Sequence, residues 1–256
     1  MRLVVKVGTS TLAYPGGGLN IRRVETLCKV IADLKNSGIE VILVSSGAIG
    51  MGVGKLGLSE RPKDMPTKQA LAAVGQCELM YVYDKIFIGY CHIAAQLLIT
   101  GSIIMDEESL NNFRNTMNRL LELDCIPIIN ENDTVETAEI AIGDNDTLSA
   151  IVASIVDADL LVLLSDIDGL YTADPHKNPD AKLIPVVNEI TPEIEALAGG
   201  AGSALGTGGM QTKINAAAIC TEAGCDMIIA NGSNPEILYS IIDGKDFGTR
   251  FISKKQ

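Results

Sequence analysis

The sequence contains no tryptophan, two histidines and few aromatic residues of any kind, 4% of its 256 positions. Its six cysteines include no C-x-x-C pair, and the only histidines are His92 and His176. The closely spaced Cys and His ligands of a structural zinc site are therefore missing from the sequence. Cys77, Cys91 and His92 form no recognisable nucleophile–base pattern, so acyl-enzyme chemistry is not favoured.

No apolar run approaches the roughly 18 residues that a membrane-spanning helix needs. The N-terminus does not resemble a signal peptide, because a short apolar stretch passes directly into a Gly-Thr-Ser turn in "MRLVVKVGTS". The net charge is −12 and no run of Lys and Arg interrupts the acidity, which disfavours binding to nucleic acid or to an anionic membrane. We expect a cytoplasmic protein with reduced, mostly buried thiols.

Hydrophobic residues are plentiful, at 47%, and fall into two patterns. Short β-branched runs predict strands, and longer segments with apolar residues three and four apart predict helices. The expected strands span 3–7, 39–44, 94–99, 125–130, 160–164 and 226–230. The expected helices span 20–36, 67–84, 109–122 and 147–156, and a last helix, "INAAAICTEAG", is opened by the glycine-rich segment 198–213. This order predicts an α/β protein, a mostly parallel central sheet sandwiched by helices, as one domain over 1–256, with two domains as the alternative.

Polar or glycine-rich residues follow nearly every expected strand, and open α/β sheets bind ligands at that carboxyl edge. The longest such segment is 130–147, "NENDTVETAEIAIGDNDT", in which two polar clusters flank a mostly apolar bridge. Such groups are costly to bury without partners. The segment is therefore either a solvated loop or the lining of a polar ligand site.

Two lysines next to glycine-rich turns are candidates for holding phosphate. Lys6 interrupts an apolar strand and precedes Gly8, Thr9 and Ser10, whose backbone N–H groups can face an anion. Lys213 closes the segment "GTGGMQTK" and lies in the first turn of an expected helix. The alternatives are a lysine that reaches water from a strand edge and a flexible surface loop.

Three other patterns fail on closer reading. The G-x-G-x-x-G at 52–57 begins eight residues after the strand ends, so it predicts a flexible loop or a close backbone approach instead of a dinucleotide site. No Walker-type phosphate loop is present in the sequence. "SDIDGLYTADP" does not have EF-hand spacing. It fits a nucleotide-contacting loop that begins with Ser165 and Asp166.

Several motifs together resemble the amino acid kinase family over the whole length, namely "VVKVGTSTL", "VSSGAIGMG", "ALAAVGQ", "PIINENDTV", "GDNDTLSAIVA", "SDIDGLYTADP" and "GTGGMQTK". The combination of "SSGAI", "NEND" and "GDND" is similar to the glutamate 5-kinases within that family. The resemblance implies an αβα sandwich that phosphorylates the side-chain carboxylate of L-glutamate with ATP, the first step of proline biosynthesis.

The resemblance also implies roles for individual residues. Positions 1–150 would mainly bind glutamate and 151–256 mainly ATP, with Mg²⁺ carried on the ATP phosphates and no metal held by the protein itself. The catalytic residues would be Lys6, Asp146 and Lys213; the ATP-binding residues Lys6, Gly8, Thr9, Ser165, Asp166, Thr207, Gly208, Gly209, Met210, Gln211, Thr212 and Lys213; and the glutamate-binding residues Ser46, Gly47, Asn130, Asp133 and Asn145.

The chemistry of this transfer agrees with those residue types. Two anions must meet, so cations and positioning matter most. The acceptor carboxylate is already ionised near neutral pH, so no general base is required and Asp146 is better interpreted as an organiser of Lys6, Lys213 or metal-bound water. Asp133 would pair with the substrate ammonium, while Asn145 adds directional bonds without charge.

Other properties follow from the resemblance alone. Family members are often inhibited by proline at the glutamate site and form homo-oligomers, dimers or tetramers. Many glutamate 5-kinases carry a C-terminal RNA-binding-like domain of the PUA type, and we expect this chain to end before it. Two other functions stay open at this point, a kinase for another small carboxylate or phosphate acceptor and a non-catalytic regulator that binds nucleotide or amino acid.

Overall fold

Strand β1 (Arg2–Val7) runs through the middle of the central sheet. A computed structural model of the chain describes all residues except 15–17, 61, 136–143, 176, 199–208 and 255–256. Within the described part, eight strands form one sheet in the order β3-β4-β2-β1-β5-β7-β8-β6. The other strands are β2 (Glu40–Val44), β3 (Ile93–Ile99), β4 (Cys125–Glu131), β5 (Leu160–Ser165), β6 (Val186–Val187), β7 (Asp226–Asn231) and β8 (Thr249–Phe251).

Six of these strands are parallel, and β8 pairs antiparallel with β7 while β6 follows the direction of β8. The expected mostly parallel sheet is therefore confirmed. The expected strands all form, and each differs from its prediction by one residue or so at its ends. The two short strands β6 and β8 at one edge were not predicted, because their runs of two and three residues are too short for a periodic signal.

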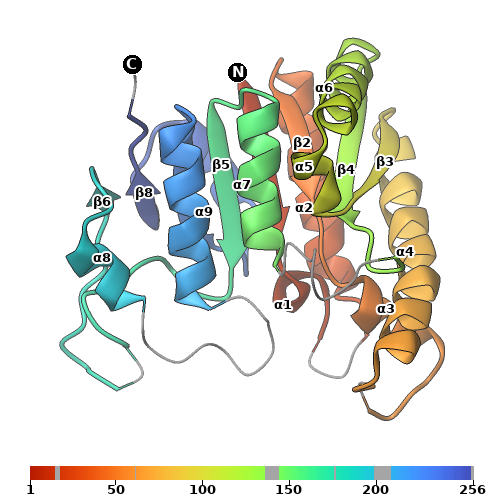
Figure 1. Cartoon of the computed structure of the whole chain (residues 1–256), viewed down its shortest axis with the longest axis horizontal. Coiled ribbons are helices and arrows are strands. Elements are labelled where there is room, and N and C mark those ends of the chain that lie inside the picture. Colours follow the sequence, from red (N-terminus) through yellow and green to blue (C-terminus); the bar gives the residue numbers. More distant parts are fainter. Residues whose placement is uncertain (15–17, 61, 136–143, 176, 199–208, 255–256) are drawn as a thin grey trace.

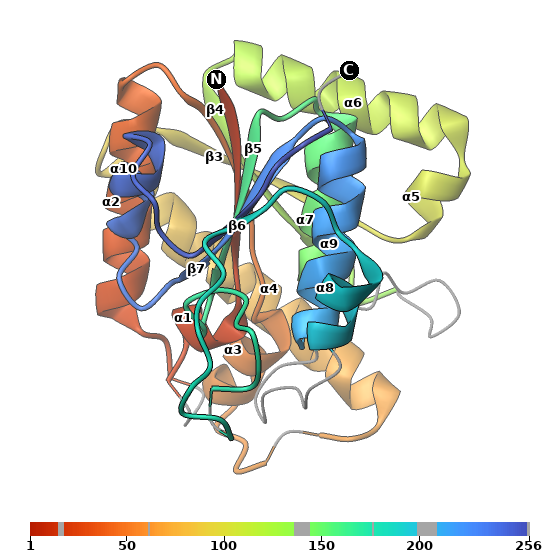
Figure 2. The same ribbon diagram turned by 90° about the vertical axis from the view of Figure 1, so that its left-hand side faces the viewer.

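Helices cover both faces of the sheet (Figure 1, Figure 2). In β1, the side chains of Leu3, Val5 and Val7 pack on one face, and Val4 packs on the other, as alternation along a strand requires. The described helices are α1 (Thr9–Leu12), α2 (Ile21–Asn36), α3 (Ala48–Lys55), α4 (Met65–Ile88), α5 (Ser102–Met105), α6 (Glu107–Glu122), α7 (Asn145–Ile155), α8 (Pro192–Leu197), α9 (Met210–Glu222) and α10 (Ile237–Ile242).

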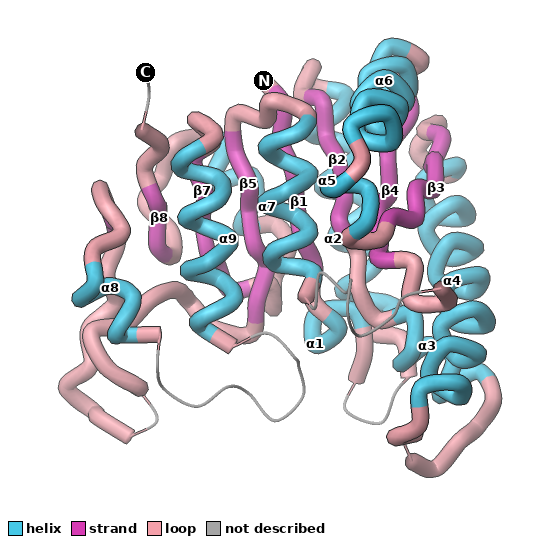
Figure 3. Tube along the Cα trace, viewed as in Figure 1, coloured by secondary structure: helices cyan, strands magenta, loops and turns pink. Residues whose placement is uncertain are grey.

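The core on the face of Leu3, Val5 and Val7 contains apolar residues of α2 and α4. The core on the face of Val4 contains those of α6, α7 and α9. Figure 3 shows α7 and α9 side by side over the strands β1, β5 and β7. Lys6 lies one residue beyond Val5 in β1, so it points to the same face as Val4, toward α7 and α9. The expected αβα sandwich is thus what the chain forms.

The strand order contains a reversal at β1. From β1 the chain moves to β2 on one side and then to β3 at the edge of the sheet. Strand β4 inserts between β3 and β2, and the chain later returns to β5 on the other side of β1. Ligands of open α/β sheets bind at the carboxyl edge where the order reverses. That edge lies at the bottom of Figure 1, where the segments after β1, β2 and β5 and the start of α7 meet.

One local prediction was wrong. The glycine-rich segment that contains Gly52 is helix α3 and not a flexible loop. The predicted close backbone approach is present, because a Cβ on Gly52 would lie 2.1 Å from the carbonyl oxygen of Leu71 in α4, and one on Gly75 would lie 1.7 Å from that of Ala48 in α3. Helices α3 and α4 therefore pack with their backbones almost in contact.

The cysteines and the apolar segments have plain structural roles. Cys28, Cys125, Cys220 and Cys225 are buried, Cys77 and Cys91 are exposed, and none of the six forms a disulfide. Across the described ranges, no helix is long and apolar enough to cross a membrane.

Candidate active site

Three charged side chains from three elements meet at the carboxyl edge. Lys6 is the penultimate residue of β1, Asp146 lies in the first turn of α7, and Lys213 is the fourth residue of α9. Helix α7 begins at this point because Asp144 caps it, accepting hydrogen bonds from the backbone N–H of Thr147 at 2.8 Å and from the Thr147 hydroxyl at 2.9 Å. The cap therefore fixes the position of the first turn of α7, and with it that of Asp146, at the sheet edge.

Asp146 forms an ion pair with each lysine. Its Oδ1 lies 2.6 Å from Lys6 Nζ, and its Oδ2 lies 3.1 Å from Lys213 Nζ. The hydroxyl of Thr212 also donates to Oδ2 at 2.9 Å. All three charged groups are withdrawn from water, with side-chain exposures of 12% for Lys6, 6% for Lys213 and 2% for Asp146. A lysine that reaches water from a strand edge, the alternative for Lys6, is therefore wrong.

The charges of the cluster do not balance. Burial by itself would raise the pKa of Asp146, but the charges of Lys6 and Lys213 and their hydrogen bonds outweigh it and lower the pKa to about 2. Asp146 is therefore an anion at neutral pH. Two ammonium groups and one carboxylate leave one excess positive charge at a buried position, beside the N-terminus of α9. Such a position attracts an anion such as phosphate.

The other predicted nucleotide residues lie on segments that leave the same edge. Gly8 and Thr9 begin α1 directly after β1. Ser165 ends β5 and donates a hydrogen bond to Asp166 Oδ1 at 3.1 Å. Gly209 precedes α9, and the first turn of that helix consists of Met210, Gln211, Thr212 and Lys213. Thr207 and Gly208 lie outside the described residues, as does the apolar bridge 138–142.

A second, uncharged cluster adjoins the first. Asn145, the residue before Asp146, places its Nδ2 at 2.7 Å from Ser45 O, 2.9 Å from Ser46 Oγ and 3.0 Å from Asn130 Oδ1. These three groups come from the ends of β2 and β4, so the start of α7 ties both strands together. The structure thus brings together Ser46, Asn130 and Asn145, three of the five residues predicted to bind the acceptor.

The remaining two predicted acceptor residues lie close by in the chain. Gly47 follows Ser46 and caps α3 with a φ of 94°, a left-handed conformation that glycine adopts at little cost. Asp133 lies in the turn that follows β4 and is partly buried. Its role in binding stays a prediction.

Sequence reasoning missed one residue of the uncharged cluster. Gln76 of α4 is 8% exposed and accepts a hydrogen bond from Asn130 Nδ2 at 2.8 Å. The segment "ALAAVGQ" was part of the family resemblance, yet no role was predicted for its last residue. A polar side chain at an apolar helix position was the available signal.

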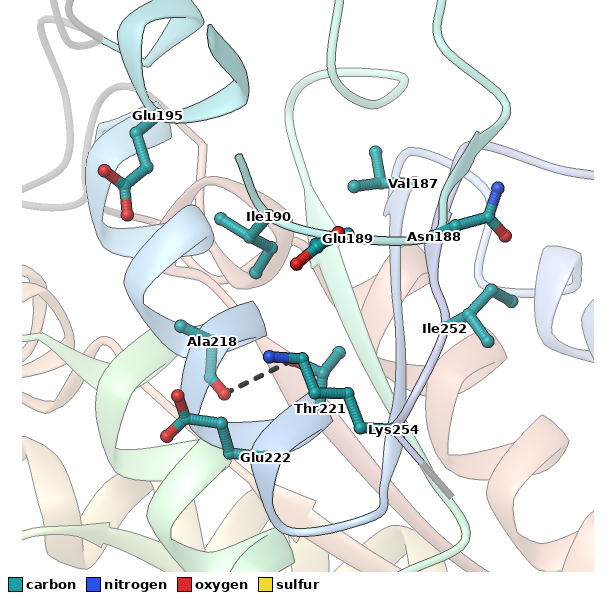
Figure 4. A pocket seen from close by; sticks show the side chains of 10 residues that line it. All are labelled: Val187, Asn188, Glu189, Ile190, Glu195, Ala218, Thr221, Glu222, Ile252 and Lys254. Atoms are coloured by element: carbon teal, nitrogen blue, oxygen red, sulfur yellow. Dashed lines mark hydrogen bonds between the residues drawn. The ribbon is translucent and has the colours of Figure 1, made fainter. Parts of the chain in front are cut away.

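A separate cavity of about 120 Å³ lies at the other end of α9 (Figure 4). Its lining includes Glu222 and Lys254. Thr221, which also lines it, follows Lys213 by eight residues, or about 12 Å of helix. This cavity is therefore distinct from the cluster of Lys6, Asp146 and Lys213.

Known proteins resemble this chain in sequence and in fold. The sequence model of the amino acid kinase family matches residues 1–231. A Clostridium perfringens protein named glutamate 5-kinase is 56% identical over 99% of this chain and 96% of its own length. A Listeria monocytogenes protein of the same name is 53% identical over 100% of this chain and 94% of its own length.

A solved structure described as carbamate kinase from Giardia lamblia bound to AMP-PNP matches with a TM-score of 0.67 and 18% identity, over 99% of this chain and 98% of its own. At that identity, the likeness shows the fold alone. The family model and the two curated relatives each cover most of the sequence that forms the sheet and its carboxyl edge. On this ground, the chain belongs to the amino acid kinase family.

Proposed function

We propose that this chain transfers the γ-phosphoryl group of ATP to the side-chain carboxylate of L-glutamate, which yields L-glutamyl 5-phosphate and ADP. The observation that carries the proposal is the position of Asp146 between Lys6 and Lys213, next to the amide cluster around Asn145. Relatives that share more than half of their residues with this chain bear the name glutamate 5-kinase. The product is an activated acyl phosphate, as the first step of proline biosynthesis requires.

The reaction brings two anions together. The γ-phosphate and the acceptor carboxylate repel each other, and charge spreads over the transferred oxygens in the transition state. Lys6 and Lys213 supply two positive charges in a site with little access to water, where electrostatic stabilisation is strong. Asp146 holds the two ammonium groups at fixed positions and limits their mutual repulsion.

No proton has to leave the acceptor. Its carboxylate is ionised near neutral pH, and one of its oxygens attacks the γ-phosphorus directly while the bond to the ADP oxygen breaks. Asp146 is a poor proton acceptor, because the adjacent lysines lower its pKa to about 2. Its role is therefore to organise the two lysines and not to act as a base.

We assign Lys6, Gly8, Thr9, Ser165, Asp166 and the segment 207–213 to the nucleotide. ATP enters as its Mg²⁺ complex, with the ion held chiefly by phosphate oxygens. The turns after β1 and β5 flank the point where the strand order reverses, which suits a nucleotide that lies across the sheet edge. Residues from 151 onward mainly serve this half of the site.

We assign Ser46, Gly47, Asn130, Asp133 and Asn145 to glutamate. The Nδ2 group of Asn145 has two hydrogens, and three protein acceptors already surround it. The substrate must therefore use the other end of that amide, Oδ1, which accepts a hydrogen bond from the substrate ammonium. Asp133 supplies the opposite charge for the same ammonium.

The resemblance also supports proline as a competitor at the glutamate site and a cytoplasmic homo-oligomer, a dimer or a tetramer. Steady-state rates with increasing proline at several glutamate concentrations test the first point. Light scattering of the purified chain tests the second. Proline inhibition that glutamate does not relieve would contradict competition.

The activity itself is tested by measuring ADP release from Mg²⁺-ATP with a panel of acceptors. Glutamate should give the highest kcat/KM, and aspartate, N-acetylglutamate, carbamate and UMP should give little turnover. A higher rate with any other acceptor would contradict the assignment of glutamate. Binding of ATP and glutamate without ADP release would instead indicate a non-catalytic regulator.

A further inference from the structure

The side chain of Gln76, from helix α4, contacts the uncharged cluster of Ser46, Asn130 and Asn145, called here the acceptor cluster. It belongs to α4, is 8% exposed, and its Oε1 accepts a hydrogen bond from Asn130 Nδ2 at 2.8 Å. Asn130 lies near the end of β4 and also contacts Asn145. Gln76 is therefore the last of three hydrogen-bonded side-chain amides, which begin with Asn145 of α7 and continue through Asn130.

Two backbone groups fix which way the side-chain amides of Asn145, Asn130 and Gln76 are turned. The carbonyl of Ser45 can only accept, so the Asn145 atom facing it at 2.7 Å is Nδ2. The backbone N–H of Glu131 can only donate, so the Asn130 atom that it meets at 2.9 Å is Oδ1. Asn130 therefore turns Nδ2 toward Gln76, and the Gln76 atom that receives it is Oε1.

This arrangement leaves the other polar atom of the Gln76 amide, Nε2, buried and without a hydrogen-bond partner among the described residues. A buried donor without a partner costs free energy. Rotating the Gln76 amide by 180° would not remove this cost, because Nε2 would then face the Nδ2 donor of Asn130 and their hydrogen bond would be lost. The molecule therefore presents a fixed N–H donor beside the acceptor cluster.

The backbone next to Gln76 lies close to the start of α3, which follows Ser46 and Gly47. Gly75, the residue before Gln76, lies so near α3 that a Cβ there would come within 1.7 Å of the Ala48 carbonyl oxygen. Ala48 is the first residue of α3 and follows Gly47 directly. Gln76 thus sits where α4, the start of α3 and the end of β4 converge.

We propose that Gln76 is a further substrate-binding residue, whose Nε2–H donates a hydrogen bond to a carboxylate oxygen of the bound acceptor amino acid. The inference rests on the proposed function, because it assigns the acceptor to the cluster of Ser46, Asn130 and Asn145. An anionic oxygen is the ligand that a fixed, buried N–H favours most.

The change Gln76→Glu separates donation to the substrate from support of the fold. A glutamate at this position still accepts the hydrogen bond from Asn130, with almost the same shape, but replaces the N–H donor with a charged oxygen. We expect the KM for glutamate to rise at least about 10-fold, as loss of one charge-assisted hydrogen bond implies. The KM for ATP should stay within about two-fold, because Gln76 lies outside the phosphate-binding cluster.

The matched control is Gln96→Glu on the edge strand β3, where the side chain is exposed. It introduces the same charge and should leave both KM values unchanged. A KM for glutamate in Gln76→Glu that stays within about two-fold of the wild type would overturn the proposal. Glutamate-dependent turnover by the wild type is measured first, so an inactive wild type refutes the proposed function and not the role of Gln76.

A second variant covers the case in which Gln76→Glu does not fold. Gln76→Met keeps the length of the side chain without hydrogen bonds or charge. We expect a raised KM for glutamate with an unchanged KM for ATP. A lower melting temperature with a normal KM for glutamate would show that Gln76 only supports the fold, and would overturn the proposal.

Discussion

The carboxylate of Asp146 and the ammonium of Lys6 form a buried ion pair, with Oδ1 and Nζ 2.6 Å apart. One partner lies on the central strand and the other in the first turn of α7, 140 residues later in the chain. Burial of two charges costs free energy, and the second lysine at 3.1 Å makes the site more positive than a single pair would be. Such an arrangement is poorly explained by stability and well explained by the binding of a phosphate anion.

Replacement of Asp146 by Asn should lower kcat for glutamate-dependent ADP release by about 100- to 1000-fold, because the two lysines lose the group that positions them. The control is Asp226→Asn, which changes a carboxylate that pairs with Arg250 at 2.6 Å near the start of β7. That control should retain turnover. Retained activity in Asp146→Asn would remove its assigned role.

Lys6→Met and Lys213→Met should each reduce kcat/KM for ATP by about 30- to 1000-fold, since each removes one cation from the developing charge of the transferred group. Lys35→Met is the matched control, because Lys35 also forms a 2.6 Å ion pair, with Asp124, but at the opposite, amino edge of the sheet, just before the start of β4. Steady-state kinetics with varied ATP measure the effect. A loss in Lys35→Met as large as in the other two would indicate a general cost of the substitution.

The low pKa of Asp146 makes the stability of the fold depend on pH. The group has a pKa of about 2 when folded and about 3.9 when unfolded, so the unfolded chain binds its proton first as the pH falls. Its contribution is complete above about pH 4 and is lost between about pH 4 and pH 2, with about 1 kcal/mol lost by pH 3.

Urea unfolding of the wild type and of Asp146→Asn at pH 5 and pH 3 measures this contribution. The wild type should lose about 1 kcal/mol more than the variant over that interval, because only the wild type can titrate at this position. An equal loss in both proteins would show that Asp146 is not held ionised by the lysines.

Gly75→Ala should destabilise the protein by about 1 to 3 kcal/mol, because the added Cβ would lie 1.7 Å from the Ala48 carbonyl oxygen. Separation of α4 from α3 should also raise the KM for glutamate, since α3 begins next to Ser46. Gly18→Ala is the control, as a Cβ there meets nothing within 4 Å. Urea midpoints and glutamate kinetics for both variants give the comparison, and a Gly75→Ala variant with the wild-type midpoint would argue against the close approach.

Asn145→Asp should raise the KM for glutamate by about 10-fold or more, because a carboxylate cannot donate to Ser45, Ser46 and Asn130 and adds negative charge beside an anionic substrate. Asn118→Asp is the control, since its Oδ1 accepts from Arg2 and an aspartate oxygen can do the same. An unchanged KM in Asn145→Asp would place the acceptor elsewhere.

The sequence contained enough information for the sheet and for the charged part of the site. Buried parallel strands are continuous apolar runs, and their carboxyl ends lie at one edge, so Lys6 and Asp146 could be expected near each other. The ion pair between Lys6 and Asp146 could not be predicted from their distance in the sequence, because only the order of the strands in the sheet brings the two residues together.

Two features depend on contacts between distant segments and were missed for that reason. Helix α3 contains three glycines, each of which disfavours a helix by about 1 kcal/mol, and it forms because α4 packs against it at Gly52 and Gly75. The role of Gln76 depends on where β4 ends relative to α4, which no local pattern records. The strands β6 and β8 were missed because they are too short to carry an alternating pattern.

The most direct test of the central claim is to trap the product with hydroxylamine, which converts an acyl phosphate into a hydroxamate and releases phosphate. With Mg²⁺-ATP and glutamate, the chain should form glutamyl hydroxamate and ADP in equal amounts, and Asp146→Asn should form both about 100- to 1000-fold more slowly. Release of ADP without hydroxamate, or hydroxamate formation by the variant at the wild-type rate, would contradict phosphoryl transfer to the glutamate side chain under the control of Lys6, Asp146 and Lys213.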